Sequence, residues 1–358
     1  MTDDIINNDN IINDDINIIT NKKIIYNEII INDETVINDK TNITQEINTI
    51  TDMNTYIDDK LLKYINIKHL NKNNIKTKTI LVLSGGGIKG IAHIGALQSL
   101  KKHNILDNIN VIAGTSIGAL IGFLYNIGYT PDELYDFILI FDFSKLNNFA
   151  PLQIFNNFGM DDGNKFELVI KEMMISKNID IDITFIELYK KTNITLITTT
   201  SCINDKEVYY FSYKTKPNMK ILIALRMAIS IPIYFVPVIY ENKMYVDGCC
   251  SNNYPINLFK NELNNVIGIY VTEHSDYTDK INNIEEFLIN LIYTLSYSIK
   301  LNEIKDYDKS TIIINLPCIS PMNLSVDNKI KENIYNIGID STDKFIKINN
   351  LSNNLEKN

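Results

Sequence analysis

The sequence contains a glycine-rich segment that could bind an anion. The segment consists of Gly85, Gly86, Gly87, Ile88, Lys89 and Gly90, and it lies between an apolar run and a stretch with helical spacing of apolar residues. Consecutive glycines let backbone N–H groups point outward without obstruction by side chains, and the start of a helix adds partial positive charge. We therefore expect an anion site here, for a phosphate or for the oxyanion of a tetrahedral intermediate.

A serine that could attack an ester lies after the next predicted strand. Ser116 is the central residue of Gly114-Thr115-Ser116-Ile117-Gly118, between the short apolar run 110–113 and another predicted helix. The pattern G-x-S-x-G in this context is typical of a nucleophile elbow, a sharp turn that exposes the serine hydroxyl near a helix N-terminus. Because Gly114 and Gly118 relieve crowding at such a turn, the pattern favours a nucleophilic role for Ser116.

The glycine-rich segment also fits the nucleotide-binding pattern G-x-G-x-x-G, but its surroundings disfavour that function. A dinucleotide site needs an acidic residue at the end of the following strand, whereas here the strand runs into Ala113 and Gly114. A phosphate-binding loop needs Lys and then Ser or Thr after its last glycine, whereas Ile91 and Ala92 follow Gly90. Both nucleotide-binding hypotheses are therefore weaker than the oxyanion hypothesis.

A nucleophilic serine needs a base, and the residues alone leave two schemes open. The histidines are His69, His93, His103 and His274. The first three precede the predicted fold or lie in or just after its first helix, so we expect structural roles for them. His274 follows the predicted strand 266–272, and Asp247, next to Gly248, ends the predicted strand 243–246. The base is therefore His274 in a triad or a carboxylate such as Asp247 in a dyad.

The elements that must position these residues alternate between strands and helices. We predict strands at 79–84, 110–113, 194–201, 208–213, 236–240, 243–246, 266–272 and 311–316. We predict helices at 91–100, after Gly118, and at 131–141, 164–176, 184–191, 218–229, 284–299 and 327–349. Thr184 and Glu187 occupy capping-box positions. The alternation predicts an α/β sandwich with a mostly parallel sheet, whose strand ends would place both motifs at one edge.

Composition excludes several other functions. The 358 residues carry a net charge of -9, which disfavours binding to nucleic acid and electrostatic docking on anionic membranes. Any membrane contact would therefore be mainly apolar. The N-terminus lacks the pattern of a secretory signal, and no apolar run is long enough to span a bilayer. Together with four cysteines outside any C-x-x-C pair, these features predict a cytoplasmic protein that is soluble or peripheral on a membrane.

The chain divides by composition into three parts. Residues 1–75 are rich in Asn, Ile and Asp and have no Gly or Pro, which is typical of a low-complexity tail without a packed core. We expect the catalytic domain at 76–275. We expect residues 276–358 to form α-rich elements that pack on the same fold.

Four motifs in one order give the sequence a family resemblance. They are the glycine loop at 85–90, G-x-S-x-G at 114–118, the segment 226–237 with its Ser and Pro residues, and Asp247-Gly248 followed by Asn253 and Pro255. In these motifs residues 79–275 resemble the patatin-like phospholipases. Cys249 stands where that family usually has Gly or Ala.

The resemblance implies both a fold and a reaction. The fold is a three-layer α/β/α domain with a mostly parallel central sheet. The reaction is hydrolysis of a fatty acyl ester of a glycerolipid, with phospholipid as the first expected substrate and neutral acylglycerol as the second. It implies a Ser116–Asp247 dyad that needs no histidine, metal or cofactor. The loop of Gly85, Gly86 and Gly87 would form the oxyanion hole, and Lys89 would anchor the loop or face head groups.

Two alternatives remain at this stage. A triad of Ser116, Asp247 and His274 follows the chain order of the α/β-hydrolases, but there the nucleophile lies several strands after the oxyanion loop, whereas here the two motifs lie on successive units. A non-catalytic module of the same fold would use its pocket only to bind lipid, which the presence of both Ser116 and Asp247 disfavours.

Overall fold

A computed structural model describes residues 78–273 except 147 and 149, then 307–317 and 325–349, with isolated positions between 281 and 306. The tail 1–75, His69 and His274 lie outside the described residues, as does most of the predicted helix 284–299. None of the described helices is both long enough and apolar enough to cross a membrane.

The centre of the fold is a sheet whose neighbouring strands are β10-β9-β1-β2-β4-β8-β7, with β5 also paired to β4. Their bounds are β1 Ile80–Leu83, β2 Val111–Thr115, β4 Thr195–Cys202, β5 Glu207–Phe211, β7 Val238–Tyr240, β8 Lys243–Asp247, β9 Val266–Glu273 and β10 Thr311–Leu316. The run from β10 to β4 is parallel, whereas β5, β7 and β8 pair antiparallel. The prediction of a mostly parallel central sheet is therefore confirmed.

Strand β1 shows why its sequence is a continuous apolar run. Leu81 and Leu83 belong to the large hydrophobic cluster on one face of the sheet, whereas Ile80 and Val82 belong to a second cluster on the other face. Successive side chains of a strand point to opposite faces of the sheet. Because both faces are covered at β1, every position of the strand is apolar and the usual alternation of apolar and polar residues is absent.

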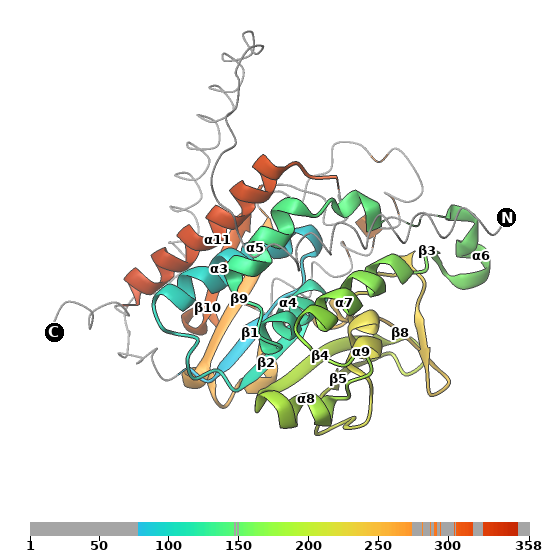
Figure 1. The fold of residues 1–358 in the computed structure, drawn as a ribbon, viewed down its shortest axis with the longest axis horizontal. Helices are drawn as coiled ribbons and strands as arrows, with labels where there is room; N and C mark the ends of the chain where they lie inside the picture. Colours follow the sequence, from blue (N-terminus) through green and yellow to red (C-terminus); the bar gives the residue numbers. More distant parts are fainter. Residues whose placement is uncertain are drawn as a thin grey trace, which may run out of the picture. The chain divides into compact units, whose positions relative to one another are not determined.

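Helices cover one face of the sheet (Figure 1). They are α3 Ile91–Lys102, α4 Ile117–Asn126, α5 Pro131–Ile140, α7 Asn164–Ser176, α8 Phe185–Thr192, α9 Ile221–Ala228 and α11 Asn328–Ile348, and the short α6 Ile154–Asn157 lies apart from them. In the described residues the other face is covered by 3₁₀ turns, at Pro255–Phe259, Leu263–Asn265 and Asp308–Ser310. Tyr254 and Tyr270 fill the second cluster beneath these turns.

Local signals explain where some elements begin and end. Thr184 and Glu187 form the predicted capping box at the start of α8. The predicted strand 236–240 is shortened to β7, which begins after Pro237, because proline has no N–H to donate to a sheet. Strand β6 (Ile233–Phe235) precedes the predicted strand and was not predicted. Strand β6 pairs with the short β3 (Gly159–Asp161) in a separate two-stranded sheet that the sequence pattern did not predict.

Candidate active site

The two glycine-containing motifs lie side by side because they follow neighbouring parallel strands. Leu83 of β1 is the register partner of Gly114 of β2, so the loop after β1 and the turn after β2 leave the same edge of the sheet. Gly85 lies so close to Ser116 that a side chain at residue 85 would meet the Ser116 Cβ at 3.2 Å. The fold therefore brings the predicted anion loop to the predicted nucleophile.

Ser116 occupies the sharp turn between β2 and α4. Its backbone has φ 53° and ψ −128°, a conformation that costs a non-glycine residue about 1–3 kcal/mol. Gly114 packs against the backbone of Gly118 at this turn, and Gly118 packs against the end of β1. The Ser116 side chain is buried, and its Oγ donates a 2.6 Å hydrogen bond to Oδ2 of Asp247.

Asp247 reaches Ser116 across strand β4. Thr115 is the register partner of Thr199, and the adjacent Thr200 is the antiparallel partner of Asp247 at the end of β8. The Asp247 N–H donates to the Ser230 carbonyl at 2.8 Å, and Gly248 packs directly on the Thr199 backbone. The carboxylate is thus held by backbone contacts on both sides of the residue.

The environment of Asp247 makes its carboxyl a stronger base than usual. The side chain is fully buried, and burial raises its pKa to about 6 because a desolvated carboxylate is disfavoured. Hydrogen bonds from the Ser116 hydroxyl and from Cys249 act in the opposite direction. Cys249 contributes its backbone N–H, which donates to Oδ1 at 2.8 Å. This residue, which departs from the family pattern, therefore supports the carboxylate directly.

The glycine loop begins the 3₁₀ turn Gly87–Gly90. Gly87 has φ 56°, in the left-handed region that favours glycine. The N–H of Gly85 donates to the Asn253 carbonyl at 3.0 Å, whereas within the described residues the N–H of Gly86 has no backbone acceptor. The amides of Gly86 and Gly87 are thus better placed than that of Gly85 to receive an oxyanion. Lys89 is buried, which fits an anchor better than a head-group contact.

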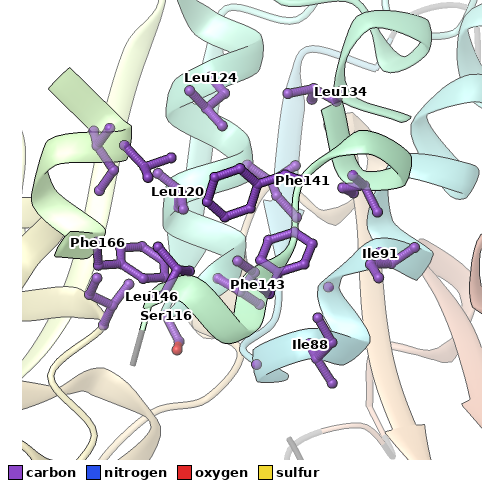
Figure 2. Close-up of a pocket in the computed structure, with 18 of the residues that line it drawn as sticks. Ile88, Ile91, Ser116, Leu120, Leu124, Leu134, Phe141, Phe143, Leu146 and Phe166 are labelled. Atoms are coloured by element: carbon purple, nitrogen blue, oxygen red, sulfur yellow. The ribbon is translucent and has the colours of Figure 1, made fainter. Parts of the chain in front are cut away.

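Ser116 lies at one end of an apolar cavity of about 130 Å³. Figure 2 shows Leu120 and Leu124 of α4 following Ser116 along one wall, with Phe141, Phe143 and Phe166 around them. Ser116 contributes the one polar side chain among the lining residues. Cavities of about this size with aliphatic and aromatic walls stay dry and accept apolar ligands.

The described histidines are His93 and His103, and both have partners other than Ser116 and Asp247. His93 is fully buried in α3, where its Nε2 is hydrogen-bonded to the Ser84 carbonyl at 2.8 Å, and burial lowers its pKa to about 4. The Nε2 atom of His103 lies 3.4 Å from Oδ1 of Asp343. These contacts fit the structural roles expected for both residues. In the described part of the chain the partner of the Ser116 hydroxyl is a carboxylate, and no cluster of three or more metal-ligating side chains occurs there.

Arg226 begins the motif 226–237, but the sequence alone indicated no role for it. The side chain is buried, and its Nη1 donates to the Ser230 Oγ at 2.6 Å. Its Nη2 donates to the carbonyls of Asp162 at 2.8 Å and Val236 at 3.2 Å. Because Ser230 also accepts from the Asp247 backbone, Arg226 connects β3 and β6 to the carboxylate. One signal of such a role was present in the sequence, because Arg226 is the single arginine in a chain whose other basic residues are mainly lysines.

Comparisons with known proteins agree with this architecture. The family model described as patatin-like phospholipase matches residues 81–260. An uncharacterized protein of Acanthamoeba polyphaga mimivirus is 33% identical over 292 residues, covering 78% of this chain and 96% of the relative. A protein of invertebrate iridescent virus 6 named "probable lipid hydrolase" is 36% identical over 183 residues, covering 50% of this chain and 62% of its own length.

A solved structure supports the fold independently of sequence. VipD from Legionella pneumophila superposes with a TM-score of 0.52 at 16% identity, covering 76% of this chain and 67% of that chain. At this identity the likeness shows the fold alone. The family model and the mimivirus relative together show that this chain belongs to the patatin-like phospholipases, a family of lipid hydrolases.

Proposed function

We propose that this chain is a serine hydrolase that cleaves fatty acyl esters of glycerolipids, with Ser116 as nucleophile and Asp247 as general base. The observation that carries the proposal is the 2.6 Å hydrogen bond between a buried serine in a strained turn and a buried carboxylate. This pair lies at the end of an apolar cavity. A serine activated by an adjacent base, beside backbone donors, is the arrangement that acyl transfer requires.

The proposed reaction has two stages. Asp247 accepts the Ser116 proton while Oγ attacks the ester carbonyl carbon, and the amides of Gly86 and Gly87 stabilise the oxyanion. Asp247 then gives the proton to the leaving alcohol, and an acyl-enzyme remains. Water attacks this ester as Asp247 accepts its proton; the bond between the acyl carbon and Ser116 Oγ then breaks, Asp247 returns the proton to Oγ, and the fatty acid leaves. A carboxyl pKa of about 6 suits both proton transfers near neutral pH.

The shape of the cavity supports a single acyl chain as the bound part of the substrate. Leu120 and Leu124 lie one and two helical turns from Ser116 on α4, so the wall extends about 12 Å from the nucleophile at 1.5 Å per residue. An acyl chain along this wall would keep its ester at Ser116 and its polar head outside. We expect phospholipid as the preferred substrate and neutral acylglycerol as the second.

We propose that the catalytic unit comprises residues 76–275 completed by elements from 276–358. Strand β10 extends the sheet beside β9, and α11 packs along α3. Residues 1–75 would then be dispensable for catalysis. Deletion of residues 1–70 tests this division, because fatty-acid release should persist, whereas loss of soluble expression would show that the tail packs on the domain.

Labelling by an organophosphonate serine probe, together with fatty-acid release from phosphatidylcholine vesicles in the presence of a chelator, tests the function. We expect the wild type to be labelled and active, whereas Ser116→Ala is neither. We expect Asp247→Asn to be inactive and His274→Ala to remain active. An inactive but folded His274→Ala would replace the dyad with the triad. A wild type that neither labels nor hydrolyses would favour a lipid-binding module.

A further inference from the structure

A short loop next to the cavity exposes large apolar side chains. In the loop 150–158, which we call the apolar loop, Leu152 and Phe155 are each 80% exposed and Phe158 is 58% exposed. Leu152 and Phe155 are three residues apart on consecutive helical turns, so their side chains share one face. Single exposed apolar residues are ordinary, whereas a cluster of them on a short segment indicates an interaction surface.

The composition of the apolar loop also differs from that of an ordinary solvent-exposed segment. No charged residue occurs from Leu146 to Met160. Phe158 is the left-handed C-cap of α6, and its N–H donates to the Ile154 carbonyl at 3.1 Å. Because most of its ring is exposed, the Phe158 side chain contributes little to packing within the domain.

The apolar loop is fixed to the walls of the cavity at both ends. On one side the chain leaves Leu146, a lining residue, and the Asn148 N–H donates to the buried Asp161 at 2.7 Å. On the other side β3 pairs with β6 so that Asp161 lies opposite Phe235, another lining residue. The Ala150 N–H donates to the Met160 carbonyl at 2.7 Å and closes the loop.

We propose that Leu152, Phe155 and Phe158 enter the apolar layer of a zwitterionic phospholipid surface and hold the cavity against that surface. This inference rests on the proposed function, because a hydrolase of glycerolipids must take its substrate from an aggregate. The cluster combines aromatic and aliphatic side chains with neutral Asn and Gln, the residue types that pass into an interface without burying charge.

The charge of the chain favours a zwitterionic lipid surface over other binding partners of the apolar loop. With a net charge of -9 the chain gains nothing from anionic lipid, so attachment must come from apolar contact. A protein partner would be expected to find charged groups at the rim of its contact, and the sequence from Leu146 to Met160 offers none. A second copy of this chain is the remaining occupant, and the experiments below separate it from lipid.

The absence of tryptophan in the chain gives a direct test. In Phe155→Trp the new indole is the only one, so its fluorescence reports position 155 alone. We expect a blue shift on addition of phosphatidylcholine vesicles and quenching by brominated phosphatidylcholine. The control is Ile348→Trp, which replaces a 57% exposed residue at the end of α11, far from α6 in Figure 1, and we expect no quenching there.

Binding and catalysis are then separated with a triple variant. Leu152→Ser, Phe155→Ser and Phe158→Asn together should weaken binding to phosphatidylcholine vesicles at least about tenfold, since burial of even one such side chain contributes more than about 1.4 kcal/mol. Hydrolysis of a monomeric, water-soluble p-nitrophenyl ester should be unchanged. The matched control, Ile175→Ser with Ile348→Ser, removes two other exposed apolar side chains and should leave both measurements unchanged.

The outcomes distinguish this inference from the proposed function. An unquenched indole at position 155, with normal hydrolysis of the soluble ester, refutes the inference and leaves the function standing. Quenching without hydrolysis of any ester retains the inference and refutes the function. Light scattering that shows a dimer in the wild type and a monomer in the triple variant, with the indole unquenched, assigns the apolar loop to a second copy instead.

Discussion

Replacing the proposed base with its neutral counterpart should make the folded protein more stable while it abolishes catalysis. Asp247→Asn keeps the size of the side chain and removes a fully buried charge. The Asn oxygen still accepts from the Cys249 N–H, and its NH₂ group donates to the Ser116 hydroxyl, so both hydrogen bonds of the carboxylate have replacements. The cost of holding a charge in this site is therefore removed, whereas the Ser116 hydroxyl hydrogen loses its acceptor, so the gain in stability is smaller than the full cost of the charge.

The expected gain follows from the pKa of Asp247. Burial raises it from 3.8 to about 6, and one pH unit of pKa difference corresponds to about 1.4 kcal/mol, so the gain is up to about 3 kcal/mol. The folded state retains its proton between these two values, whereas the unfolded chain loses it. The stability of the wild type therefore falls as pH rises from about 4 to about 6, and the advantage of the variant grows over that range.

Urea unfolding of wild type and variant between pH 3.5 and pH 8.5 measures this difference, because other titrating groups cancel between the two chains. The control is Asp136→Asn, which removes an exposed carboxylate of α5 and should change little. Ser116→Ala is a second control: it is expected to be inactive but to gain no stability, since it takes a donor from a buried carboxylate. An advantage for Asp247→Asn that is absent at pH 8, or that does not depend on pH, would refute the reasoning.

Three further predictions concern the same site. The kcat/KM of the wild type for a soluble ester should fall below about pH 6, as Asp247 is protonated, with a slope of one proton in initial-rate measurements. Ser116→Gly should be more stable than Ser116→Ala by about 1–3 kcal/mol in urea unfolding, because both lack the hydroxyl and only glycine accepts φ 53° and ψ −128° without strain. Leu124→Trp should lower kcat/KM for long-chain esters at least about tenfold and spare short-chain esters, since each methylene excluded from the cavity costs about 0.8 kcal/mol.

Each of these predictions has a clear contrary outcome. A pH profile that is flat down to pH 5 would mean that a different group accepts the proton. Equal stabilities of the glycine and alanine variants would mean that the turn at Ser116 is unstrained. An unchanged chain-length profile in Leu124→Trp would place the acyl chain elsewhere, and Leu120→Trp, one turn nearer to Ser116, should then be without effect as well.

The local parts of this architecture were predictable from the sequence. The apolar run before Gly85 predicted β1, and the capping residues Thr184 and Glu187 predicted the start of α8. Both follow from residues close together in the chain, where propensity and spacing act directly. The order of the two glycine motifs also predicted that they share one sheet edge, because successive parallel strands carry them.

Long-range pairings were not predictable in the same way. Nothing near Asp247 indicates that β8 lies antiparallel to β4, although this pairing brings the carboxylate to Ser116. The three-residue strand β3 is too short to leave a periodic pattern, and the role of Arg226 depends on carbonyl groups far away in the chain. Such contacts depend on tertiary packing between segments that are distant in the chain. In a single sequence they are visible only as a residue whose type has no local explanation.

The antiparallel insertion of β8 has a consequence for biosynthesis. Ser116 and Asp247 are separated by 131 residues, and the chain emerges from the ribosome with its N-terminal part first. During translation the nucleophile turn is complete well before the carboxylate exists, so a nascent chain has a serine without its base. Any hydrolysis that needs both groups begins only when β8 pairs with β4, and an unfinished or truncated product would be unable to attack cellular lipid.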